Sequence, residues 1–259
     1  MGGSRRFLLV AFQTIVIKEV RRFTRIWMQT LVPPAITIAL YFLIFGNLIG
    51  RRIGEMGGID YMQFIVPGLI MMAVIQNSYS NVASSFFSHK FQRSVEEILV
   101  SPVPDWITLA GFCAGGMARG LFVGLIVTIM SFIFTDLSIQ HPLLTILVVL
   151  LTSVVFSLAG FLNALFANTF DDISIIPTFV LTPLIYLGGV FYSIDLLPSF
   201  GQFISALNPV LYMINTFRFG ILGTSDVNVW WALFMLVFFI AALASAALAL
   251  LRRGTGLRH

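Results

Sequence analysis

The sequence contains little charge: Asp, Glu, Lys and Arg make up only 10% of its 259 residues, while hydrophobic residues make up 58%. A soluble domain is typically about 25% charged, so a water-soluble globule of this length could not hide so much apolar surface. The composition therefore indicates an integral membrane protein. The formal net charge of +4 does not point to nucleic acid as a partner, because the basic residues flank apolar segments.

Residues suited to metal or phosphate chemistry are also scarce. Cys113 is the single cysteine, which excludes a disulfide framework and a cysteine-based metal site. Neither lysine, Lys18 or Lys90, follows a glycine, whereas the lysine of a phosphate-binding P-loop does. We therefore expect no metal and no cofactor in this chain, and any ATP chemistry has to come from a partner. The histidines are too far apart in sequence to favour a metal site: His89, His141 and His259.

Six apolar stretches are long enough to cross a bilayer core of about 30 Å. Their length and continuity favour helices over barrel strands, since a lipid-exposed backbone must satisfy its own hydrogen bonds. The sequence thus predicts an all-α integral membrane protein with six transmembrane helices in a membrane domain over 26–252. The expected spans are 26–49, 60–84, 107–134, 142–167, 173–192 and 229–251.

The distribution of Lys and Arg predicts that both termini, including a tail at 253–259, and the loop 85–106 are cytoplasmic. Three basic residues then lie on the outer side (Arg51, Arg52 and Arg218), and Arg119 lies within a span. The cytoplasmic side holds the other eleven: Arg5, Arg6, Lys18, Arg21, Arg22, Arg25, Lys90, Arg93, Arg252, Arg253 and Arg258.

The apolar stretch 209–222 is too short to be a seventh span. As a helix it would be about 21 Å long, and a crossing there would move the C-terminal arginines to the outer side. We expect 193–226 to be an outer excursion with two short re-entrant helices, at about 199–206 and 209–222. Asn208 is a suitable N-cap, with Pro209 at the first helical position and Gly223 as the stop.

Two amphipathic segments are expected on the cytoplasmic side. Residues 12–27, within an N-terminal segment 1–25, favour an interfacial helix that either anchors the chain on the inner leaflet or also touches a partner. The loop 89–101 favours a helix that docks on another protein, or alternatively a solvated connector, and Ser101-Pro-Val-Pro104 ends it. The apolar face of the first is Phe12, Val16, Val20, Phe23 and Trp27; the second has an apolar stripe of Phe91, Val95, Ile98 and Leu99 and polar Gln92, Arg93, Glu96 and Glu97.

Several polar residues within the spans allow two interpretations. Asn77, Asn81 and Ser84 share one face of the second span and could line a substrate path or dimer axis, or hold neighbouring helices together. Arg119 could contact substrate, snorkel, or pair with Asp171 or Asp172 of the inner loop. For Arg218 the alternatives are snorkelling, pairing with Asp195 or Asp226, and contact with an anionic head group.

The stretches 188-GGVFYSIDLLP-198 and 208-NPVLYMINTFR-218 resemble the C-terminal signature of the ABC-2 type exporter permeases, and 63-QFIVPGLIMM-72 and 91-FQRSVEEILVSPVP-104 are similar to it as well. Residues 12–252 are identified with this family, with the YadH-like subgroup of Gram-negative bacteria as the nearest match. The resemblance implies that 193–226 closes the outer end of the pathway. Its gate residues would be Gly188, Gly189, Pro209, Tyr212 and Arg218.

The same resemblance implies that 91–101 is the coupling helix on an ATPase subunit, with Phe91, Arg93, Val95, Glu96, Glu97 and Ile98 as the coupling residues. A working exporter in the bacterial inner membrane would contain two copies of this chain, surrounding lipids, and two copies of a separate ATP-binding protein that holds Mg-ATP. The substrate is not identified by the sequence, although an amphipathic or lipid-like cargo suits it.

An ion-coupled secondary transporter or channel is the alternative, but it requires intramembrane acids, and the acids here cluster at span ends. A membrane enzyme would require a catalytic cluster, and none is found.

Overall fold

The computed structural model describes residues 2–254, except for the side chains of residues 2–4, Asn47, Glu96, Ile98 and Leu99. Of the predicted tail 253–259, residues 255–259 therefore lie outside the described residues. Over the described range the chain is helical almost throughout, as predicted. Strands β1 (Glu55–Met56) and β2 (Ile59–Asp60) form a small antiparallel hairpin. Gly57 and Gly58 join them with φ angles of 61° and 78°, as a two-residue hairpin turn requires.

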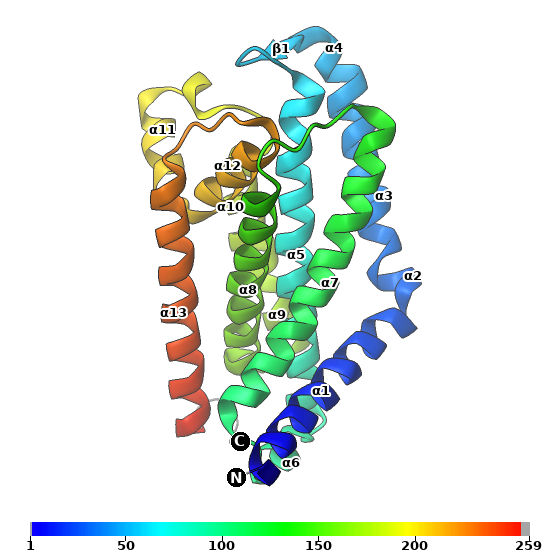
Figure 1. The fold of residues 1–259 in the computed structure, drawn as a ribbon, viewed down its shortest axis with the longest axis vertical. Coiled ribbons are helices and arrows are strands. Elements are labelled where there is room, and N and C mark those ends of the chain that lie inside the picture. The colour runs from blue at the N-terminus through cyan, green and yellow to red at the C-terminus, as the bar shows by residue number, and fades with distance from the viewer. Residues whose placement is uncertain (1, 255–259) are drawn as a thin grey trace.

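Four helical segments are long and apolar enough to cross a membrane, judged by length and composition. One is Trp27–Ile53, which combines α2 (Trp27–Thr30), α3 (Val32–Tyr41), the π-helical η1 (Phe42–Ile49) and α4 (Gly50–Ile53). The others are α7 (Asp105–Phe134), α8 (Pro142–Phe166) and α13 (Val229–Arg253). They coincide with four of the six predicted spans, and the latter three run along the long axis of the molecule (Figure 1).

The second predicted span belongs to α5 (Tyr61–Phe91), which continues well beyond residue 84. Its 31 residues rise about 46 Å, more than a bilayer core. Helices α7 and α8 pack along α5, so most of its side chains are buried and it forms the centre of the bundle (Figure 1). The length of α5 is sufficient for a span, although it carries more polar residues than the four helices above.

The fifth predicted span, 173–192, is shorter in the structure than expected. Helix α9 (Phe170–Ile176), the π-helical η2 (Pro177–Leu181) and α10 (Thr182–Tyr186) follow one another directly, and their 7, 5 and 5 residues rise only about 25 Å. Residues 187–192 are not helical, which corrects the predicted boundary. The cause is local, because Gly189 has a φ of 75° that an α-helix cannot accommodate.

Glycines on two faces of α7 let two different helices approach it closely. A Cβ atom at Gly116, Gly120 or Gly124 would collide with α5. On the other face, a Cβ atom at Gly111 or Gly115 would collide with Ile15 or Glu19 of α1 (Gly2–Arg25). The small-residue spacing of this helix therefore fixes two helix–helix contacts.

Helix α1 is longer than the predicted helix 12–27 and ends two residues earlier. Its most buried side chains are Glu19 and Phe23, and Phe12, Val16 and Val20 are half-buried, so the face that packs on the bundle includes these predicted apolar residues and extends to Glu19. Trp27, predicted to share that face, starts α2 and is exposed. The break occurs at Ile26, whose φ of −111° and ψ of 36° are not helical.

The two short helices of the excursion have the predicted boundaries: α11 spans Ser199–Ala206 and α12 spans Pro209–Leu222. A short 3₁₀ turn, η3 (Ile194–Leu196), precedes them. The Asn208 carboxamide oxygen accepts a hydrogen bond of 3.0 Å from the Val210 N–H, and Gly223 is left-handed with a φ of 77°. Both caps are as predicted, so the local sequence defines α12.

The start of α1, the end of α13 and the short helix α6 (Val95–Val100) lie at one end of the molecule (Figure 1). The β-hairpin and α4 lie at the opposite end, and α11 lies toward that end (Figure 1). Below, the first is called the α6 end and the second the hairpin end.

Candidate functional site

The predicted coupling helix 89–101 is divided in the structure. Helix α5 continues to Phe91, residues 92–94 form a turn, and α6 covers only Val95–Val100. Arg93 has a φ of 59°, which breaks an α-helix, and this corrects the expectation of one continuous helix. The end of α6 is as predicted, because Ser101 is extended and precedes a proline.

The predicted coupling residues differ in how they face the bundle. Val95 is buried and packs in a core cluster with Phe86 and Phe87. Phe91 is 64% exposed, and Arg93 and Glu97 are exposed as well. The side chains of Glu96 and Ile98 lie outside the described residues. Helix α6 is thus anchored through Val95, while its described charged side chains face outward.

Lys90, which was not among the predicted coupling residues, fixes the base of this segment. Its side chain is only 8% exposed, and its Nζ donates hydrogen bonds of 2.9 Å to the Leu165 carbonyl and 2.6 Å to the Ala167 carbonyl. These carbonyls lie at the C-terminus of α8, where a cation is favoured by the helix dipole. Burial lowers the pKa of Lys90, and the Asp172 carboxylate partly opposes this.

The first turn of α9 is held by its own cap and by aromatic contacts with the end of α5. Thr169 and Asp172 form a capping box in which the carboxylate accepts from the Thr169 N–H at 3.0 Å. The Phe170 ring packs against Phe87 and Phe91, with centroid distances of 4.9 Å and 5.1 Å. The α5–α6 turn and the α8–α9 turn are therefore held together as one unit.

A histidine holds the turn between α5 and α6. The His89 Nδ1 and the Ser94 Oγ are 2.8 Å apart. The pKa of His89 is lowered to about 4, first by burial and then by the positive charges of Lys18 and Arg22. His89 is therefore neutral at pH 7.

A polar cluster joins α1 to α5 and was not predicted. Glu19 is 1% exposed, and its carboxylate accepts hydrogen bonds from the Ser85 hydroxyl at 2.6 Å and the Asn81 amide at 3.4 Å. Arg22 pairs with Glu19 at 3.3 Å and donates to the Asn81 carbonyl and Oδ1 at 3.0 Å and 2.9 Å. The i,i+3 spacing of Glu19 and Arg22 is visible in the sequence, but their partner helix is not.

Of the predicted pathway residues, Asn77 and Asn81 are buried within the chain. Asn81 contacts α1, so it holds two helices together, which was one of the two predicted alternatives. The Asn77 amide donates a hydrogen bond to the Ala73 carbonyl of its own helix. Ser84 keeps partial exposure. The partly exposed polar residues of α5 follow a step of four, displaced from the predicted face: Gln76, Ser80, Ser84 and Ser88.

Arg119 does not pair with Asp171 or Asp172, since the described residues contain a single ion pair, Arg22 with Glu19. Instead, its guanidinium donates to the Thr30 carbonyl at 3.2 Å. That carbonyl would normally accept from residue 34, which is a proline and has no N–H. Arg119 therefore supplies the hydrogen bond that the Thr30 carbonyl would otherwise lack, at a break in the helix of the first predicted span.

The predicted gate residues meet around Arg218, which is 1% exposed. Its guanidinium donates to the Gly189 carbonyl at 2.6 Å, to Asn215 Oδ1 at 3.0 Å and to the Phe64 carbonyl at 3.4 Å. It also lies 3.9 Å from the centroid of the Phe64 ring, within cation–π range. Arg218 thus neither snorkels nor forms an ion pair with Asp195 or Asp226.

The other gate residues hold α12 against its neighbours. A Cβ atom at Gly188 would meet Val210 and Ile214 of α12, so the glycine lets the 187–192 turn lie on that helix. Pro209 begins α12, and the Tyr212 hydroxyl donates to the Ala206 carbonyl at the end of α11 at 2.9 Å. The five predicted residues therefore form one connected structure in which the loop after α10 closes over α12.

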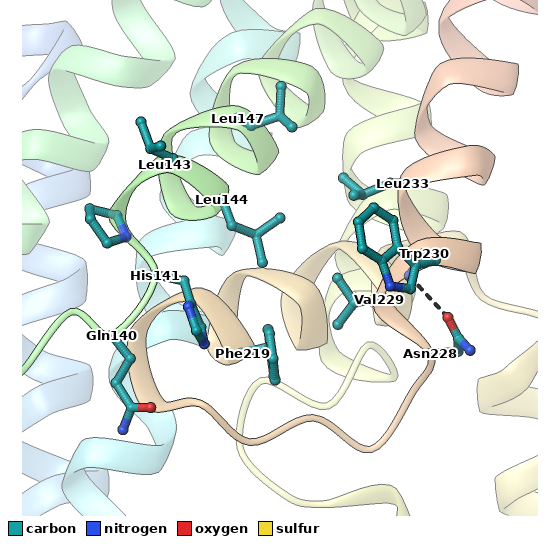
Figure 2. Close-up of a pocket in the computed structure, with 11 residues that line it drawn as sticks. Gln140, His141, Leu143, Leu144, Leu147, Phe219, Asn228, Val229, Trp230 and Leu233 are labelled. Atoms are coloured by element: carbon teal, nitrogen blue, oxygen red, sulfur yellow. Dashed lines mark hydrogen bonds between the residues drawn. The ribbon is translucent and has the colours of Figure 1, made fainter.

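A cavity of about 820 Å³ lies between α8, α12 and α13, and none of the predicted pathway residues lines it (Figure 2). Its lining is mostly apolar and includes Leu144, Leu147 and Leu233. The His141 ring stacks on Phe219 with a centroid distance of 5.0 Å. Asn228 caps α13 by accepting from the Trp230 N–H at 3.0 Å (Figure 2).

The described residues contain no group of three or more His, Cys, Asp or Glu side chains placed to hold a metal ion. The arrangement offers anchored helices, a buried arginine and outward charges. Helices held together in this way can transmit movement from one to another.

Comparison with known proteins agrees with this arrangement. Residues 10–222 match the family model of the ABC-2 type transporters. The chain is 59% identical over 249 residues to the inner membrane transport permease YadH of Escherichia coli K12, which covers 96% of this chain and 97% of the relative. It is 24% identical over 215 residues to nodulation protein J of Rhizobium leguminosarum bv. viciae, covering 83% of each. The chain therefore belongs to the ABC-2 type transporter family and is a membrane permease subunit of an ABC transporter.

Proposed function

We propose that this chain is half of a homodimeric exporter in the bacterial inner membrane, with both termini in the cytoplasm. A separate ATP-binding protein, also in two copies, holds Mg-ATP and drives it. In this arrangement α5 and the α9–α10 segment are the two further spans, which gives six. Helices α11 and α12 dip into the outer leaflet from the hairpin end.

The attachment of α6 is the observation that carries this proposal. Helix α6 lies at the same end as the start of α1 and the end of α13 (Figure 1), where the basic residues also concentrate. Val95 fixes it to the core, and Lys90 fixes the preceding turn to α8. A push on α6 therefore reaches α5 and α8 directly, as a coupling element requires.

The hairpin end supports export with an outer gate. Burial of Arg218 and its bond to Gly189 tie the loop after α10 to α12, which supports a gate formed by these two elements. Breaking these contacts would open a way between α5 and α12. The substrate path runs beside the partly exposed face of α5 that includes Ser84, and Arg119 supports the helix next to it. An amphipathic or lipid-like cargo suits these surroundings.

Affinity purification in mild detergent tests the proposal by asking whether an ATP-binding protein is retained with this chain. We expect the ATPase to co-purify, and Glu97→Lys combined with Glu96→Lys to lower its yield, because Glu97 is exposed and the two substitutions together reverse the charge of this helix. Arg51→Glu with Arg52→Glu at the hairpin end is the matched control and should leave the yield unchanged. If neither pair of substitutions alters the complex, α6 is not the docking element.

A further inference from the structure

Four cations of α1 line one side of an open cleft of about 930 Å³ at the α6 end. They are Lys18, Arg21, Arg22 and Arg25, and they occupy little more than two helical turns. The apolar part of the lining includes Ile17 and Ile26. The cleft therefore combines concentrated positive charge with apolar surface.

The charge of the cleft is not neutralised from within the described residues. The one acid of α1, Glu19, is buried on the opposite side against α5 and α7. Lys18, Arg21 and Arg25 have no carboxylate within ion-pair distance in the described part of the chain. The described fold thus provides a carboxylate for Arg22 alone, and the remaining cations are exposed and available to an anionic ligand.

Arg22 is held in position for a ligand. All its hydrogen bonds among the described residues come from the NH2 nitrogen, which contacts Glu19 and Asn81. Its Nε is buried without a hydrogen-bond partner among the described residues, while the side chain as a whole is 31% exposed. A guanidinium can donate five hydrogen bonds and binds phosphate through two of them at once, so Arg22 keeps donor capacity while its orientation is fixed.

The apolar neighbours indicate a lipid as the source of the anion. Ile17 and Ile26 of the cleft are exposed, and Trp27 and Met28 follow at 52% and 69% exposure. Free phosphate would gain nothing from this surface, whereas an acyl chain would cover it. Basic residues beside exposed apolar residues at the start of a span are the pattern of anionic lipid recognition at a cytoplasmic surface.

We infer that this cleft binds the phosphate of an anionic membrane lipid, with Arg21, Arg22 and Arg25 on the head group and Ile17 and Ile26 along the acyl chain. Because Arg22 also contacts Asn81 in α5, the bound lipid is linked directly to the central helix. The site depends only on α1 and its neighbours, so it stands independently of the ATPase and of the proposed export function.

Native mass spectrometry of the full chain, released from nanodiscs of phosphatidylglycerol and phosphatidylcholine, tests the inference. Arg21→Gln with Arg25→Gln removes two exposed cations that form no ion pair, and Arg51→Gln with Arg52→Gln removes two at the hairpin end. Each cation near a membrane surface changes anionic lipid affinity about fivefold. We expect the first pair to lower phosphatidylglycerol retention roughly 20-fold, and the second to change it less than twofold.

Three results would overturn the inference. Equal loss of lipid in both double variants would indicate general surface charge rather than a site. Displacement of phosphatidylglycerol by millimolar inorganic phosphate would indicate a free-anion site without an acyl subsite. Unchanged lipid retention with loss of ATPase co-purification in Arg21→Gln/Arg25→Gln would indicate that the cleft docks a protein. A charge-preserving variant, Arg21→Lys with Arg25→Lys, should keep most of the retention.

Discussion

The Arg218 guanidinium donates a hydrogen bond of 2.6 Å to the Gly189 carbonyl, 29 residues earlier in the chain. This bond joins α12 to the loop after α10 at a point that is fully inside the protein. The Gly189 backbone has a φ of 75° and its carbonyl lies outside any helix, so the arginine is its hydrogen-bond partner. The relationship connects the two halves of the sequence signature that indicated the family.

Replacement of Arg218 should therefore affect stability as well as transport. Arg218→Ala leaves the Gly189 carbonyl and Asn215 Oδ1 without this donor, and each buried unsatisfied group costs about 1–3 kcal/mol. We expect the free energy of unfolding, followed by tryptophan fluorescence during titration with SDS, to fall by roughly 2–4 kcal/mol. Export should decrease more than membrane insertion does.

Arg51→Ala, at an exposed position of the hairpin end, serves as the control and should change stability by less than ~0.5 kcal/mol. Arg218→Lys keeps the charge but not the planar fork, so it should recover only part of the loss. Equal expression with unaltered transport and stability in Arg218→Ala would dismiss the proposed role of this residue.

Two glycine contacts on α5 should differ in tolerance. A Cβ atom at Gly160 of α8 would collide with backbone atoms of Tyr79 in α5, whereas at Gly124 of α7 the described neighbour is a single methyl group of the Val74 side chain. Gly160→Ala should destabilise the chain by about 1–3 kcal/mol, and Gly124→Ala by distinctly less. The same SDS titration measures both, and an equal or reversed order would refute the packing of α8 on α5.

Stability should also depend on pH through His89. Its pKa is about 4 in the folded chain and about 6.5 when unfolded, so below pH 6.5 the unfolded state binds a proton that the folded state does not. The contribution of neutral His89 is complete above about pH 6.5 and is lost as the pH falls toward 4. Because the side chain is only half-buried, we expect a loss of roughly 1–2 kcal/mol.

Comparison of His89→Gln with the unaltered chain isolates this effect. The variant should show a flatter dependence of the unfolding free energy on pH between 6.5 and 4. An unchanged slope in His89→Gln would show that this histidine titrates with its ordinary pKa.

Local features of the structure followed from the sequence, and distant contacts did not. Asn208, Pro209 and Gly223 act on their own helix, so the boundaries of α12 could be predicted from caps alone. The partners of Arg119 and Arg218 include Thr30 and Phe64, which lie 89 and 154 residues away. No local pattern encodes such pairs, and the predicted alternatives for both arginines therefore named the wrong partners.

The same distinction explains the other corrections. The division of the coupling segment depends on a positive φ at Arg93, a residue type that rarely adopts it. The burial of Glu19 in α1 depends on its hydrogen bonds with Ser85 and Asn81 of α5, and a buried carboxylate on an interfacial helix is not expected from amphipathic spacing. The polar face of α5 was recognised, but its burial depended on where α1 and α7 pack.

ATP turnover in liposomes tests the central claim most directly, namely that this permease does no work without a separate ATPase. The chain reconstituted alone should hydrolyse no ATP. Adding the ATP-binding protein that co-purifies with it should give turnover that Glu96→Lys with Glu97→Lys lowers severalfold and Arg51→Glu with Arg52→Glu does not. Hydrolysis by the purified chain alone, at a rate matching the complex, would contradict the account.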